Sequence, residues 1–186
     1  AAMGYDLYCQ MVIEAVAELS GEPREALVEI RVEVPVDAHL PEDYVGRADL
    51  RLEAYRKLTS AGATVDAANV EAVRTEWEDR YGPLPAPAEA LLAVARLRTV
   101  CVSRGITEAT VTRRPGAVLG SKPQLEARCS PVELPLSRQA RLARLHPEAL
   151  LKEGTRQLHL PLDTDDPVAE LTGLLEDLVP VLHPVP

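Results

Sequence analysis

The feature that constrains the fold most is a change in the spacing of apolar residues along the chain. Across Leu27–Val34 apolar and charged residues alternate, which predicts a strand with one buried face. From about residue 47 to residue 104 apolar residues recur every three or four positions instead, which predicts helices. Alternation returns after Ile106, so the sequence predicts a segregated α+β fold rather than a regular βαβ repeat.

Three consecutive helices are predicted in the middle of the chain. They span about Arg47–Ala61, Asp66–Tyr81 and Pro87 to residue 104. Gly62 is expected to close the first helix as a left-handed residue, and Asp66 to cap the second, with a hydrophobic staple between Val65 and Val70. The stripe predicted to be buried on the second helix is Val70, Val73, Trp77 and Tyr81.

Short strands and two further helices are predicted after the central helices. The strand candidates are Ile106–Thr112, Ala117–Leu119, Leu125–Cys129 and Thr155–Leu162. Ser137 is expected to cap a short helix that ends near His146, and Asp166 with Pro167 to open a last helix. The predicted architecture is therefore a helical half of three helices, packed with a small mixed or antiparallel β-sheet and two further helices.

The two ends of the chain differ from its middle. Tyr5–Leu19 has the apolar spacing of a helix, and Ser20–Pro23 then interrupts it as a linker would. The first helix is therefore assigned to an element that precedes the domain. Residues 181–186, rich in proline, are expected to form a flexible tail.

The composition excludes several classes of protein. The net charge is −9, which opposes binding to a polyanion such as DNA. No apolar run is long enough to span a membrane and no signal peptide is recognisable, so a cytoplasmic protein is expected. Cys9, Cys101 and Cys129 are scattered and form no Cys-x-x-Cys pair, which predicts buried thiols rather than a zinc site or disulfides.

The sequence contains no recognisable catalytic motif. The phosphate loop, the Gly-x-Gly-x-x-Gly fingerprint and the Gly-x-Ser-x-Gly elbow are all missing. The histidines stand far apart in sequence, and the cluster Asp163, Asp165 and Asp166 fits a helix cap better than a calcium loop. No catalytic residue, cofactor or metal is therefore predicted for this domain.

A charged strip on the second predicted helix is the most informative polar feature. Glu76, Asp79 and Arg80 stand at positions i, i+3 and i+4, so they share one helix face that is offset from the buried stripe. One interpretation is a solvated surface in which Glu76 pairs with Arg80. The other is a surface that offers acidic and basic groups to a protein partner.

Five segments resemble, in order and spacing, the bacterial transcription-repair coupling factors. They are Gly4–Tyr8, Val36–Val45, Arg51–Leu58, Asp79–Pro85 and Leu91–Arg98, and the resemblance covers about residues 4–106. This family consists of multidomain ATP-dependent DNA translocases. They remove RNA polymerase stalled at DNA damage and recruit the excision-repair protein UvrA.

The resemblance implies a regulatory role for this chain. Residues 1–25 would be a linker helix from the preceding motor, and residues 26–180 the C-terminal regulatory domain. That domain would dock on the protein's own N-terminal UvrB-like module, mask the UvrA-binding surface and restrain the motor, with Glu76, Asp79 and Arg80 in the contact. RNA polymerase and double-stranded DNA would bind elsewhere in the parent, and ATP and magnesium would bind its motor.

Two other functions compete with this interpretation. An accessory nucleic-acid-binding domain would use Arg113 and Arg114, or Arg138, Arg141 and Arg144 on the short helix, although the acidic total charge weighs against it. A small enzyme is the weaker alternative, because no convergent catalytic set is visible. The resemblance and the charge together favour a protein-interaction domain.

Overall fold

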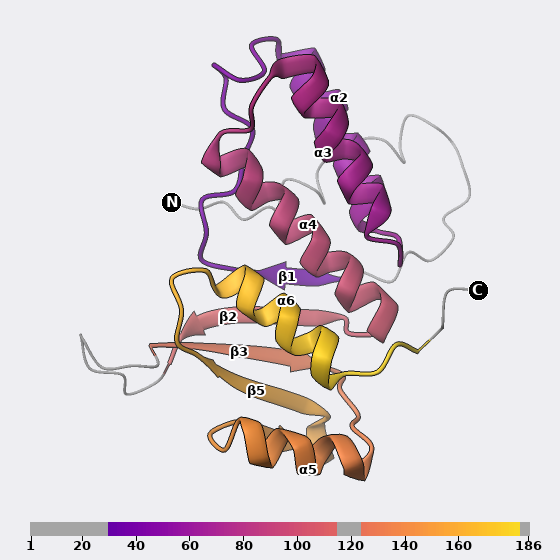
Figure 1. The fold of residues 1–186 in the computed structure, drawn as a ribbon, viewed down its shortest axis with the longest axis vertical. Helices are drawn as coiled ribbons and strands as arrows, with labels where there is room; N and C mark the ends of the chain where they lie inside the picture. Colours follow the sequence, from indigo (N-terminus) through magenta and orange to yellow (C-terminus); the bar gives the residue numbers. More distant parts are fainter. Residues whose placement is uncertain (1–29, 115–123, 183–186) are drawn as a thin grey trace. The chain divides into compact units, whose positions relative to one another are not determined.

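A computed structural model of the chain describes residues 30–114 and 124–182. The described residues form two compact units, a helical unit of residues 36–99 and a sheet unit of residues 30–35 and 100–182. Helix α4 (Ala86–Arg104) begins in the helical unit and ends in the sheet unit (Figure 1). The predicted helix Tyr5–Leu19 and the predicted strand Ala117–Leu119 lie outside the described residues, as does Cys9.

The helical unit contains two of the three predicted helices and the first part of the third. Helix α2 (Ala48–Gly62) packs on α3 (Ala68–Tyr81), and the first part of α4 completes the unit. The stripe of α3 is buried as predicted at Val70, Val73 and Trp77, while Tyr81 is half-buried. The other large buried side chains of the unit are Leu40, Val45, Leu58, Leu91, Leu92, Val94 and Leu97.

The predicted ends of these helices agree only in part with the observed ones. Asp66 Oδ1 accepts the Ala68 N–H at 2.9 Å, but the N-cap of α3 is Ala67, so the predicted cap is wrong by one residue. Val65 is exposed, which argues against the expected staple to Val70. Gly62 is the last residue of α2 and right-handed Ala63 follows it, so the left-handed glycine predicted there is also wrong. The left-handed glycine occurs instead at Gly82, which ends α3 with φ 87°.

The sheet unit contains a five-stranded mixed sheet. Its strand order is β1 (Arg31–Glu33), β2 (Glu108–Arg113), β3 (Leu125–Ser130), β5 (Gln157–Leu162) and β4 (Leu150–Lys152). Strands β1 and β2 are parallel, and every other pair is antiparallel. The α+β fold with a mixed sheet is thus confirmed, but strand β4 was not predicted.

One face of this sheet is apolar and covered. The register aligns Ala109 with Cys129 and Ala127 with Leu160, so the buried side chains of β2, β3 and β5 point the same way. Helix α6 (Pro167–Leu178) lies across this face and contacts β5 (Figure 1). Helix α5 (Leu136–Leu145) lies beside α6, and Arg141 pairs with Asp177 across the two helices at 2.6 Å.

Two of the predicted helix caps have opposite outcomes. Asp166 accepts the Ala169 N–H at 3.0 Å and Pro167 stands in the first turn of α6, so this cap is confirmed. Ser137 does not cap α5, because that helix already begins at Leu136 after Pro135 and has no side-chain cap. The end of α4 follows a Schellman motif: Ile106 N–H donates to Cys101 C=O, and Gly105 has φ 66°.

The two described cysteines are buried, as their apolar surroundings predict. Neither Cys101 nor Cys129 forms a disulfide with a described residue, and burial raises the pKa of Cys129 well above its usual range. The Cys129 thiol therefore keeps its proton and is a poor nucleophile. Among the described helices, none combines the length and the apolar character that crossing a lipid bilayer requires.

The cap of α6 generates a stability prediction. Replacing Asp166 with alanine leaves a backbone N–H of the first turn without its acceptor, and should lower the free energy of unfolding by about 1 kcal/mol. Urea unfolding followed by circular dichroism would measure the change. The matched control is Asp165→Ala, which removes an exposed carboxylate one residue away. Equal effects of the two substitutions would contradict the capping role.

Candidate functional site

The charged strip predicted from the sequence lies at the C-terminal end of α3. Asp79 and Arg80 are exposed, and Glu76 is partly exposed on the preceding turn. Trp77, between them in sequence, is only 1% exposed and belongs to the core of the helical unit. The strip therefore stands on a helix whose opposite side is fixed by apolar packing.

Glu76 does not pair with Arg80, so that expectation is wrong. Its carboxylate pairs with Lys57 of α2, nineteen positions earlier in the chain. The guanidinium of Arg80 lies over the ring of Tyr81 instead, 5.4 Å from its centroid. Glu76 therefore connects α3 to α2, while the guanidinium of Arg80 lies on the Tyr81 ring at the end of the helix.

Asp79 is the least committed of the three residues. It is exposed, and it makes no hydrogen bond or ion pair with any residue that the structure describes. An exposed carboxylate that has no partner within its own domain keeps its hydration until another molecule approaches. Asp79 and Arg80 thus offer one negative and one positive group at adjacent positions.

A network around Arg74 fixes α3 against α4. Arg74 Nη1 donates to Glu89 Oε1 at 2.8 Å, and Glu71 and Glu78 lie 3.7 and 3.6 Å from the same guanidinium. The hydrogen bond and the charge of Arg74 hold the pKa of Glu89 below its usual value of 4.5, against the opposing effect of burial. This anchor lies on the turns that precede the strip, so the helix that carries Asp79 is firmly placed.

Tyr44 fixes the end of α3 from the preceding loop. Its hydroxyl donates to Trp77 C=O or to Gly82 C=O, at 3.1 and 3.0 Å, and its ring meets Tyr81 edge-on at 5.7 Å. Burial first, and then the negative charge of Glu78, raise the pKa of Tyr44, so this hydroxyl keeps its proton. Tyr44 was not singled out from the sequence, because nothing local shows that it reaches a helix more than thirty residues away.

The surface beside the strip has only a small depression. The depression between α2 and α3, lined by residues such as Lys57, Glu76 and Arg80, has a volume of about 10 Å³. Small-molecule sites are usually cavities of about 300–1,000 Å³. The depression beside the strip is therefore too small to hold a small-molecule ligand.

The arginines of the nucleic-acid alternative are largely occupied. Arg141 pairs with Asp177, and Arg138 donates to the backbone carbonyl of the same residue. Arg114 pairs with Glu148 at 2.8 Å. Because these contacts neutralise or engage most of the proposed patch, they count against DNA binding through it.

Two of the described histidines contact a carboxylate through their side chains. His39 Nδ1 lies 2.9 Å from Asp37, and His159 Nδ1 lies 3.1 Å from Glu126. Burial opposes ionisation of Glu126, but hydrogen bonds from Arg128 and His159 leave its pKa lowered overall. Within residues 30–114 and 124–182, no group of three potential ligands is placed to hold a metal ion.

The described residues form a small α+β domain, and the charged strip stands at the surface of helix α3. The family model described as "TRCF domain" matches residues 34–126. The chain therefore belongs to the TRCF domain family, which is the family indicated by the sequence resemblance.

Relatives and a solved structure agree with this assignment. The chain is 38% identical over 173 residues to the transcription-repair-coupling factor of Mycobacterium tuberculosis, which covers 87% of this chain and 13% of the relative. It is 34% identical over 98 residues to that of Myxococcus xanthus, which covers 53% of this chain and 8% of the relative. The chain thus spans about an eighth of the length of the mycobacterial relative.

The crystal structure of a C-terminal domain of transcription-repair coupling factor has the same fold. The TM-score is 0.58 at 18% sequence identity, and the match covers 79% of this chain and 88% of that one. The chain is therefore a TRCF domain with the fold of the C-terminal domain of a transcription-repair coupling factor.

The Arg74–Glu89 contact generates a pH prediction. Because the folded pKa of Glu89 is lowered, its stabilising contribution is present above pH 4.5 and is lost as the pH falls through the folded pKa. Arg74→Met should therefore destabilise the chain at neutral pH and make unfolding less dependent on pH under acidic conditions.

Urea unfolding midpoints measured from about pH 7 down to about pH 3 would test this prediction. The control is Arg56→Met, which removes an exposed arginine from α2 without touching the network. An Arg74→Met chain whose midpoint falls with pH as steeply as that of the unmodified chain would contradict the assigned role of Glu89.

Proposed function

We propose that this domain is the autoinhibitory protein-interaction domain of an ATP-dependent DNA translocase that acts in transcription-coupled nucleotide excision repair in the cytoplasm. It docks on the N-terminal UvrB-like module of the same protein, masks the surface that UvrA binds and restrains the motor. The observation that carries the proposal is the exposed pair Asp79 and Arg80 at the end of a rigidly held helix. Family membership supplies the biological setting.

The chemistry of the strip suits a contact that must open again. Asp79 and Arg80 are polar and exposed, so they are well solvated when the partner leaves. A large apolar contact would be harder to release, since each square ångström returned to water costs about 25 cal/mol. A polar strip therefore favours a reversible closed state over a permanent one.

The rigidity of α3 makes the strip a defined contact. The buried side chain of Trp77 packs α3 into the core, and Arg74 binds Glu89 of α4. The Tyr44 hydroxyl hydrogen-bonds the last turn of α3. Binding then costs little further ordering of the backbone, because the helix is already in place. A difference of about 1–3 kcal/mol between the closed and open states is enough to change the occupancy of a competing site several-fold or more.

The remaining parts of the proposal concern the parent protein. ATP and magnesium are assigned to its motor, and RNA polymerase and double-stranded DNA to its other domains. This domain is assigned neither a cofactor nor a reaction. UvrA is the competitor that gains access when the domain leaves the UvrB-like module.

The strip generates a binding prediction. Asp79→Lys should weaken the affinity of this chain for the separately purified UvrB-like module by about threefold to tenfold, because it places a positive charge where the partner meets a carboxylate. Glu76→Lys should act in the same direction, although it also places a second lysine beside Lys57. Arg80→Glu should weaken binding if the guanidinium itself meets the partner. Isothermal titration calorimetry would measure these affinities.

The matched control is Asp165→Lys, which makes the same charge change at an exposed aspartate of the sheet unit, outside the Arg74 network. In the whole translocase, Asp79→Lys should also raise UvrA affinity and ATPase rate in the absence of polymerase. The free energy of unfolding, obtained from thermal melts, should stay within about 0.5 kcal/mol of that of the unmodified chain, because Asp79 is a surface residue. Unchanged binding with an unchanged melt would show that the strip is only solvated surface.

A further inference from the structure

The ion pair between Lys57 and Glu76 divides the residues of the strip into two kinds. Asp79 and Arg80 are exposed, and neither forms an ion pair with a residue that the structure describes. Glu76 is different, because the ammonium group of Lys57 already occupies its Oε2 and partly cancels its charge. A basic group of a partner that approaches Glu76 therefore competes with a cation of the domain itself.

This ion pair can open without disturbing the fold. The side chains of Lys57 and Glu76 are 52% and 36% exposed. Ion pairs at the surface contribute little to stability, because water screens the charges and two long side chains lose rotamer freedom. The buried side chains Leu58 on α2 and Trp77 on α3 pack these helices whether the pair is closed or open.

A second carboxylate is available to Lys57 when Glu76 is taken. Glu53 stands four positions before Lys57 on α2, a spacing that makes the two side chains neighbours on the helix surface. It is exposed, and within residues 30–114 and 124–182 it has no hydrogen bond or ion pair. Glu53, Lys57 and Glu76 all line the depression between α2 and α3. Lys57 thus has two carboxylates beside the same depression and binds one of them.

The charges around the depression and the strip indicate how Lys57 affects a partner. Three are negative, on Glu53, Glu76 and Asp79, and two are positive, on Lys57 and Arg80. A partner that brings a basic group to Glu76 is repelled by Lys57 as long as the ammonium stays at that carboxylate. The repulsion decreases when the ammonium moves toward Glu53.

We propose that Lys57 regulates docking by exchanging partners: it binds Glu76 while the domain is free, and it turns to Glu53 when a basic group of the UvrB-like module takes Glu76. The proposal rests on the docking function proposed above and concerns the regulation of the same strip. The free domain then carries its own competitor for a docking carboxylate, which weakens the closed state and makes it easier for UvrA to displace. Because of Glu53, Lys57 has an anionic partner in both states.

Lys57→Met tests the competition. It keeps most of the length of the side chain and removes the charge, so the affinity of the chain for the separately purified UvrB-like module should rise by about twofold to fivefold. The control is Arg56→Met, which removes a neighbouring exposed cation that has no ion pair with a described residue and does not line the depression. Salt screens this more distant charge, so the affinity should change by less than about 1.5-fold. Isothermal titration calorimetry measures both affinities.

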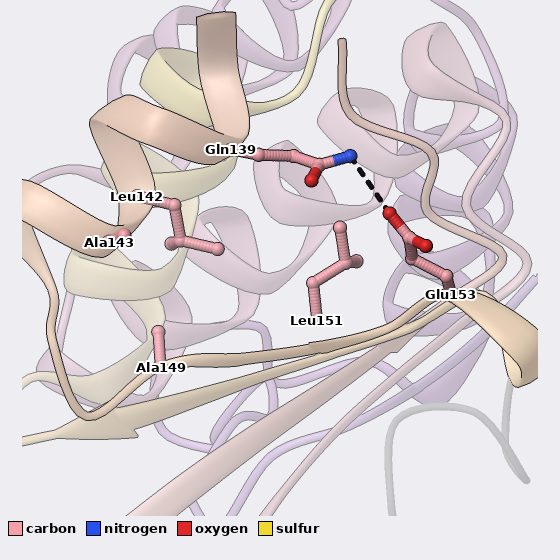
Figure 2. Close-up of a pocket in the computed structure, with 6 residues that line it drawn as sticks. All are labelled: Gln139, Leu142, Ala143, Ala149, Leu151 and Glu153. Atoms are coloured by element: carbon pink, nitrogen blue, oxygen red, sulfur yellow. Dashed lines mark hydrogen bonds between the residues drawn. The ribbon is translucent and has the colours of Figure 1, made fainter. Parts of the chain in front are cut away.

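A double-mutant cycle shows whether the effect passes through Glu76. In a Glu76→Gln chain Lys57 has no docking carboxylate to compete for, so adding Lys57→Met should raise the affinity no more than Arg56→Met does. The matched background is Glu153→Gln, which also neutralises an exposed glutamate, but in the sheet unit. There Gln139 donates to Glu153 at 3.1 Å beside the hollow between α5 and β4 (Figure 2). Lys57→Met should keep its full effect in that background.

The exchange itself is followed by NMR through the side-chain carboxyl carbons of Glu53 and Glu76. When the unmodified chain is saturated with the module, both signals should shift, because Glu76 gains a new cation and Glu53 receives Lys57. In the Lys57→Met chain only the Glu76 signal should shift, since no ammonium group moves to Glu53.

Three results would overturn the proposal. If Asp79→Lys weakens binding but Lys57→Met leaves it unchanged or weakens it, the strip docks and Lys57 does not compete. If the Glu53 signal shifts equally in the Lys57→Met chain, Glu53 contacts the module directly and receives no partner from Glu76. If neither Asp79→Lys nor Lys57→Met changes the affinity, the docking function itself fails, and the regulation by Lys57 fails with it.

Discussion

The structure depends on helix α4, whose middle is buried over more than one full turn. Leu97–Cys101 are five consecutive buried residues, more than one full turn of helix, and Leu91, Leu92, Val94 and Ala95 are buried before them. A helix of this kind is stable in water only when other elements cover it on all sides. The first part of α4 belongs to the helical unit, and its last turn belongs to the sheet unit. The helix ends in the Schellman motif at Gly105.

In the helical unit, packing against α4 fixes the position of the charged strip on α3. Helix α3 is held by the burial of Trp77 on one side and by the Arg74–Glu89 contact with α4 on another. The only direction left for Asp79 and Arg80 is outward, and Tyr44 keeps the last turn from fraying.

Most of the fold could be predicted because its signals are local. The alternation at Leu158, Leu160 and Leu162 identified β5, and the pair Asp166–Pro167 identified the start of α6. What failed depends on contacts that are distant in sequence. Strand β4 is three residues long and exists because β5 pairs with it, so no pattern of its own reveals it. The strip residues were correctly expected to be accessible on α3, but the partner of Glu76 is Lys57 on another helix, which i to i+4 spacing cannot show. Tyr44 was missed for the same reason.

The claim that the α3 strip is the docking surface is tested most directly by locating the contact on the unmodified protein. The isotopically labelled chain is titrated with the separately purified UvrB-like module, and its backbone amide signals are followed by NMR. The account predicts that the largest shifts or losses of signal cluster at residues 76–82 of α3 and its C-terminal turn, while strands β2 and β3 are unaffected. A saturating titration that leaves the signals of residues 76–82 unchanged would contradict it.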